Sequence, residues 1–165
     1  MKTMKWIIVL FLISGFTFAQ QMTPERLVDI IKQEADTADI QGNSVRFLFN
    51  DAILISIYDK NANRMRIISP IVEREKLGEE ELLNALVANF HSALDVKYAL
   101  SDEMVWSVFA HPLKELSEAQ VIDAIHQVYA AALTFGGSYS STNLVFPGNT
   151  QRKEKPKEPR ILKKI

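Results

Sequence analysis

Apolar residues recur with the period of a helix in three separate stretches of the chain. The first stretch follows Thr23-Pro24-Glu25, which has the chemistry of a helix start: a capping hydroxyl, a proline that loses no intrahelical bond, and an acid near the positive end of the helix dipole. A helix is therefore predicted from Pro24 to about Glu34. The apolar stripe of this helix consists of Leu27, Ile30 and Ile31.

The second and third helical stretches have equally clear starts. Gly78-Glu79-Glu80-Glu81 places three acids where the helix dipole favours them, and Ser117-Glu118-Ala119-Gln120 resembles a capping box that opens a helix ending at Gly136-Gly137. The second helix is predicted to be a core helix, with its apolar stripe at Leu82, Leu83, Leu86, Val87, Phe90 and Leu94. The predicted buried stripe of the third is Val121, Ile122, Ile125, Val128, Tyr129, Ala132 and Leu133.

Between the helices the apolar period changes to two, which is typical of strands. Alternation predicts three strands at 45–49, 53–58 and 65–68, and two more at 96–100 and 104–110. The linkers between them are short and rich in turn formers, so antiparallel hairpins are expected. Both faces of the strand at 53–58 are largely apolar, which indicates that a partner subunit, a peptide or another part of the chain covers the face opposite the helices.

The order α-β-β-β-α-β-β-α predicts an α+β fold in which an antiparallel sheet has its helices packed on one face. The domain is expected to occupy residues 20–140. Residues 141–165 are predicted to form a disordered tail, basic from residue 152, because Ser, Thr, Asn, Gly and Pro replace the apolar pattern.

The first 19 residues have the three parts of a secretory signal peptide. Lys2 and Lys5 are positive, an apolar run follows from Trp6, and small residues precede a cleavage site predicted between Ala19 and Gln20. The apolar run ends at Phe18, which makes it shorter than the roughly 20 residues that span a bilayer. The protein is therefore expected to be exported, to the periplasm or the extracellular space.

Charge is distributed unevenly along the remaining chain. Residues 20–150 contain 10 Lys/Arg and 18 Asp/Glu, a net charge of −8, whereas residues 151–165 have a net charge of +5. The acidic body argues against nucleic acid as the main partner. The tail has two interpretations. It is either a tether to an anionic membrane surface or an acidic partner, or an end that only increases solubility. Its candidate contact residues are Lys153, Lys155, Lys157, Arg160, Lys163 and Lys164.

No catalytic, cofactor or metal motif is found, so no cofactor is expected. The chain has no cysteine, which excludes disulfides and thiolate chemistry. His91, His111 and His126 lack the close spacing of a zinc site. No serine stands in a Gly-x-Ser-x-Gly elbow, and the turn at 59–63 lacks the glycine of a calcium loop because Arg64 occupies that position.

Over residues 24–139 the chain resembles the type III secretion chaperone-like fold and, within it, the YbjN-like family of small bacterial proteins. The resemblance rests on the order of elements and on four segments, at 82–90 (LLNALVANF), 97–102 (KYALSD), 116–117 (LS) and 132–136 (ALTFG). It implies a compact α+β domain without enzymatic activity, often dimeric, that presents a surface to other proteins. No functional residue is carried over, because the family supplies no site motif.

We therefore predict an exported, non-enzymatic protein-binding module of the cell envelope, chaperone-like or regulatory, whose partner is another protein or a second copy in a homodimer. Cytoplasmic secretion chaperones bind an effector before export, a role that the predicted signal peptide here argues against. Two alternatives stay open. One is an envelope hydrolase or small-ligand-binding protein with a pocket between helices and sheet; the other is a membrane-surface protein tethered by its basic tail.

Overall fold

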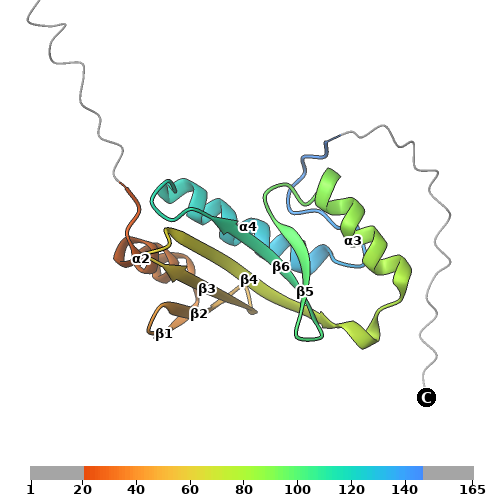
Figure 1. Cartoon of the computed structure of the whole chain (residues 1–165), viewed down its shortest axis with the longest axis horizontal. Coiled ribbons are helices and arrows are strands. Elements are labelled where there is room, and N and C mark those ends of the chain that lie inside the picture. The colour runs from red at the N-terminus through yellow and green to blue at the C-terminus, as the bar shows by residue number, and fades with distance from the viewer. Residues whose placement is uncertain (1–20, 147–165) are drawn as a thin grey trace, which may run out of the picture.

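The computed structural model describes residues 21–146, which form one six-stranded antiparallel sheet and three helices (Figure 1). The predicted signal peptide, its cleavage site at Ala19 and Gln20, and the basic residues of the tail lie outside the described residues. The strand order in the sheet is β1-β2-β3-β4-β6-β5. The elements are α2 (Pro24–Glu34), β1 (Thr37–Gln41), β2 (Ser44–Phe49), β3 (Ala52–Asp59), β4 (Arg64–Glu73), a short 3-10 turn (Arg74–Lys76), α3 (Glu79–His91), β5 (Lys97–Ser101), β6 (Met104–His111) and α4 (Glu118–Thr134).

Both predicted helix caps are confirmed. At the start of α2, the Thr23 hydroxyl accepts a hydrogen bond from the backbone N–H of Arg26 at 3.2 Å. At the start of α4, the Ser117 hydroxyl accepts from the Gln120 N–H at 3.3 Å, and the Gln120 side chain accepts in return from the Ser117 N–H at 2.8 Å. These bonds satisfy N–H groups that the first helical turn leaves without an intrahelical partner.

Strand β1 was not predicted from the sequence. All five of its residues are exposed, and it pairs with β2 across a two-residue turn in which Gly42 has a φ of 60°. Because this edge strand buries neither face, its sequence shows no apolar alternation. The expected break at Gly42-Asn43 is therefore a tight hairpin turn, and the sheet has one strand more than predicted.

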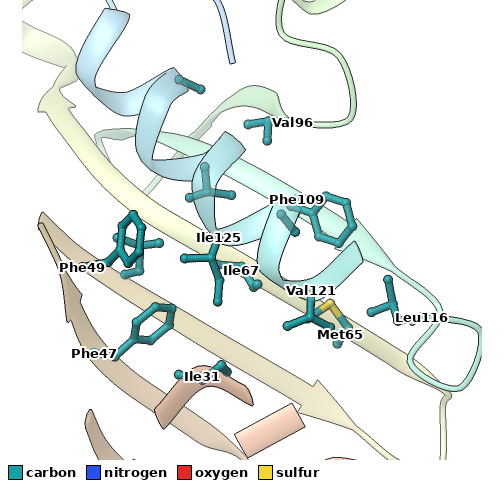
Figure 2. Packing of buried hydrophobic residues seen from close by; sticks show 14 of the residues in the cluster. Ile31, Phe47, Phe49, Met65, Ile67, Val96, Phe109, Leu116, Val121 and Ile125 are labelled. Atoms are coloured by element: carbon teal, nitrogen blue, oxygen red, sulfur yellow. The ribbon is translucent and has the colours of Figure 1, made fainter. Parts of the chain in front are cut away.

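The core lies between one face of the sheet and the two helices that pack on that face, α2 and α4. Figure 2 shows Phe47 and Ile67 of the sheet pointing toward Ile31 of α2 and toward Val121 and Ile125 of α4. These five side chains are at most 2% exposed. The predicted arrangement, an antiparallel sheet with helices packed on one face, is confirmed for these two helices.

Helix α3 lies apart from this layer, at the β5 end of the sheet and far from α2 (Figure 1). Its fully buried residues are Ala85 and Ala88, so the prediction of a core helix with a buried leucine-rich stripe is wrong. Spacing shows that a helix has an apolar side, but it does not say which surface that side faces. Leu133, predicted to be buried in α4, is likewise 70% exposed.

The packed chain continues past the domain boundary predicted at residue 140. Ser141 is 4% exposed, and its backbone N–H donates to the Ser92 carbonyl at 3.1 Å. Residues 141–146 therefore belong structurally with α3.

Candidate functional site

The most prominent unburied apolar surface is one side of helix α3. Leu83, Leu86, Val87 and Phe90 follow the spacing i, i+3, i+4, i+7 and are 61%, 64%, 40% and 77% exposed. These four residues, named here the α3 stripe, share one side of the helix. A contiguous row of large exposed side chains marks an interaction surface, whereas isolated exposed leucines do not.

The opposite side of α3 is held close to the rest of the molecule. Ala85 and Ala88 are small enough to let the helix backbone approach its neighbours, and the Asn89 amide bonds to the backbone of Tyr98 in β5. At the N-terminal end, the Glu81 carboxylate accepts from the Gly78 N–H at 3.0 Å. The α3 stripe is therefore presented by a helix whose opposite side is attached to β5.

Residues 139–146 extend this apolar surface beyond the end of the helix. The Ser92 hydroxyl donates to the Tyr139 carbonyl at 2.6 Å, and the Phe146 N–H donates to the His91 carbonyl at 2.8 Å. These bonds bring the last described residues beside the C-terminal turn of α3. Three of them, each 54–56% exposed, add to the apolar surface there: Leu144, Val145 and Phe146.

An aromatic cluster beneath α3 supports this region. The rings of Tyr98, Phe135 and Tyr139 lie 5.1–5.9 Å apart in edge-to-face pairs, a favourable geometry for aromatic rings. The Tyr98 hydroxyl donates to the Ala131 carbonyl at 3.0 Å. Burial disfavours the phenolate and raises the pKa of Tyr98 to about 12.

A second apolar surface lies on the sheet face that points away from α2 and α4. Seven half-buried side chains form it, and the name open face is used for it below: Leu48, Ile53, Ile55, Ile57, Ile68, Trp106 and Val108. Alternation places them opposite the core residues of the same strands. The prediction that β3 is apolar on both faces is confirmed. What covers the open face stays a prediction.

The three histidines considered as metal ligands do not converge. His91 contacts the Phe146 carbonyl, His111 the Pro112 carbonyl, and His126 lies 3.9 Å from the Glu34 carboxylate. In the part of the chain that the structure describes, no group of three His, Asp or Glu side chains is placed to hold a metal ion. The three histidines therefore lie at three separate places in the fold.

The layer between helices and sheet is filled mainly by apolar side chains. Two buried serines there bond to the backbone, with Ser69 donating to the Ile53 carbonyl and Ser107 to the Val128 carbonyl. An open hollow of about 340 Å³ lies instead at the β1 edge, where its lining includes Asp39, Arg46 and Phe47. Its position does not match the predicted pocket between helices and sheet.

Within residues 21–146, no helix combines the length and the apolar character that crossing a membrane requires.

Comparison with known proteins places the fold. No protein-family model matches the chain, and no curated protein sequence matches it. Among solved structures, the chain is similar to a chain of the HopA1–SchA chaperone–effector complex, with a TM-score of 0.53 and 12% sequence identity. The similarity covers 66% of this chain and 88% of that one. It confirms the predicted chaperone-like α+β fold.

Proposed function

We propose that this protein is an exported, non-enzymatic, chaperone-like module that binds another protein and acts as a homodimer. The observation that carries the proposal is the α3 stripe, which is exposed on a helix whose opposite side is attached to β5 through Asn89. The chaperone-like fold supports a role in protein binding, because a chain of a chaperone–effector complex shares it. Membership of the YbjN-like family is part of the same proposal.

The α3 stripe has the chemistry of a self-association surface. Burial of a leucine or phenylalanine side chain contributes about 1.5–3 kcal/mol, so four such residues on each protomer supply a substantial driving force. In a symmetric dimer the same surface is used by both copies. The proposed interface is therefore α3 against α3 of a second copy.

The charge at the start of α3 favours an antiparallel arrangement. Glu79 and Glu80 occupy the first turn, whereas His91 lies in the last. Parallel packing would bring the acidic ends of two helices together, and like charges repel. Antiparallel packing separates them and brings Leu83 of one copy toward Phe90 of the other.

The mass of the purified chain in solution tests this proposal. We expect a dimer for the wild type and a monomer for Leu86→Glu, because a carboxylate in the centre of the α3 stripe would be buried without a partner. Leu133→Glu is the matched control, since Leu133 is also a largely exposed leucine on a helix but lies outside the stripe. It should remain dimeric.

Light scattering coupled to size exclusion reports the mass, and circular dichroism checks that both variants are folded. A wild-type monomer at high concentration, or a dimer that survives Leu86→Glu, would contradict the dimer. Partner binding is tested by affinity capture of the tagged chain after cross-linking in its host. Recovery of no defined protein, together with a strict monomer, would contradict the whole proposal.

Export is tested separately by the N-terminal sequence of the protein isolated from its host. The expected mature N-terminus is Gln20, which follows from cleavage after Ala19. Recovery of the intact Met1 terminus from the cytoplasmic fraction would contradict the export part and leave the binding part unaffected.

A further inference from the structure

The open face carries a continuous row of side chains with a cation at each end. Strand register pairs Arg46 with Ile55, Ile55 with Ile68, and Ile68 with Val108. Val108 is in turn paired with Lys97 in β5. Cross-strand partners project from the same face of a sheet, so three apolar side chains lie between a guanidinium and an ammonium group.

This face is positively charged although the body of the protein is acidic. Four cations project from it, Arg46, Arg64, Arg66 and Lys97, against three strand carboxylates, Asp39, Asp59 and Glu73. The net charge of these groups is +1, whereas residues 20–150 together carry −8. An excess of positive charge is thus concentrated where apolar side chains are also exposed.

The carboxylates of the open face are engaged locally. Asp59 accepts from the backbone N–H groups of Asn61 and Ala62, and Asp39 accepts from the Gln41 side chain. Glu73 forms an ion pair with Lys76 at 2.6 Å. Among the described residues, none of the four cations forms an ion pair. Lys97 donates to the Leu94 carbonyl and Arg64 to the Asn63 carbonyl. These acceptors are neutral, so the four positive charges are not compensated and can pair with the carboxylates of a partner.

The dimensions of the row suit a helix lying along the strands. Arg46 and Lys97 are separated by four strand spacings, which is about 19 Å at roughly 4.8 Å per spacing. A helix with its side chains is about 10–12 Å wide, so it fits between the two cations above the apolar centre. The central strands already pair their backbone groups within the sheet, so the face offers side chains and no strand edge.

We infer that the open face binds an amphipathic helix of a partner protein, with the apolar side of that helix on Ile55, Ile68 and Val108 and its flanking carboxylates paired with Arg46 and Lys97. This inference rests on the proposed protein-binding function and adds the chemistry of the partner. The basic segment at 151–165 of this chain does not fit the same face, because its net charge is +5.

Trp106 provides a probe of this face. The chain contains two tryptophans, Trp6 and Trp106, so full-length Trp6→Phe leaves one indole, which lies on the open face and outside the α3 stripe. The ligand is a synthetic helical peptide with a leucine stripe flanked by glutamates. A twin peptide has lysine in place of every glutamate. Titration with the glutamate peptide should shift the Trp106 emission to the blue. The lysine peptide should bind the chain at least about tenfold more weakly than the glutamate peptide does.

Charge reversal on the open face supplies the matched variants. Arg46→Glu combined with Lys97→Glu should weaken binding of the glutamate peptide about tenfold or more and improve binding of the lysine peptide. Lys32→Glu combined with Lys60→Glu changes the net charge equally at sites outside the open face, so peptide selectivity should be retained. Circular dichroism confirms that both double variants are folded.

Three results would overturn the inference. Equal binding of the two peptides would show that charge does not select the partner. A Trp106 shift with phosphatidylglycerol vesicles but with neither peptide would assign the face to lipid. A concentration-dependent shift of the chain alone would assign it to a second copy. Because Leu86→Glu tests α3 and Trp106 tests the sheet, failure of the dimer proposal and failure of this inference are distinguishable.

Discussion

Two hydrogen bonds join the Asn89 side chain in α3 to the backbone of Tyr98 in β5. The Asn89 carbonyl oxygen accepts from the Tyr98 N–H at 2.7 Å, and its amide nitrogen donates to the Tyr98 carbonyl at 3.1 Å. Because β5 is an edge strand, its outward backbone groups would otherwise be open to pairing with another chain. The Asn89 side chain thus attaches α3 to β5 and occupies two backbone groups at the β5 edge of the sheet.

Replacement of Asn89 should lower the stability of the fold. Asn89→Ala leaves the Tyr98 backbone groups without these partners, and a loss of about 1–3 kcal/mol in the free energy of unfolding is expected. Asn89→Asp keeps an acceptor for the N–H but places a second oxygen against the Tyr98 carbonyl, so it should also destabilise. Urea unfolding measures both. Asn61→Ala, in the exposed β3–β4 turn, should change stability by less than about 0.5 kcal/mol; equal effects at the two asparagines would contradict this account.

Two buried serines should respond in opposite ways to the same substitution. Ser56 and Ser107 are both 0% exposed, but Ser107 donates to the Val128 carbonyl at 2.9 Å whereas the Ser56 hydroxyl has no hydrogen-bond partner among the described residues. Ser107→Ala should cost about 1 kcal/mol. Ser56→Ala removes a buried hydroxyl that has no partner, so stability should stay equal or rise by up to about 1 kcal/mol. A loss at Ser56 as large as at Ser107 in parallel denaturant titrations would disprove the distinction.

The Tyr98 hydroxyl should make the fold sensitive to alkaline pH. Burial raises its pKa from 10.0 to about 12 in the folded state, so between these values the unfolded chain releases the proton first. Stability is therefore unaffected by this group below pH 10 and falls as the pH rises toward 12. Tyr98→Phe should reduce this alkaline loss, although burial also raises the pKa of Tyr139, whose contribution remains. Urea unfolding across this pH range measures the loss, and identical slopes for wild type and variant would refute the assignment.

The elements that the sequence predicted well are those whose signals are local. The Thr23 and Ser117 caps depend on residues within one turn, and the alternation in β2, β3 and β6 reflects a buried and a less buried side. Strand β1 escaped prediction because it is exposed throughout and lies at an edge. Its only strong local marker is the turn at Gly42.

The candidate binding surfaces could be predicted only in part. The apolar second face of β3 is visible in the sequence, but the row from Arg46 to Lys97 depends on the pairing of five strands, which one segment cannot reveal. The α3 stripe was recognised as apolar and assigned to the core. Its direction is decided by tertiary contacts, since Ala85, Ala88 and Asn89 attach the opposite side of the helix to the fold.

Deletion of residues 152–165 tests the proposed role of the basic tail. If the tail tethers the protein to an anionic surface, the full-length chain should sediment with phosphatidylglycerol vesicles at low salt, because each Lys or Arg near such a surface contributes about 1 kcal/mol. The deletion variant should remain in the supernatant, and high salt should release the full-length chain by screening. Phosphatidylcholine vesicles control for binding without charge. Lys163→Glu combined with Lys164→Glu should give an intermediate result, whereas equal sedimentation of the full-length and deleted chains would rule out the tether and favour a tail that only solubilises.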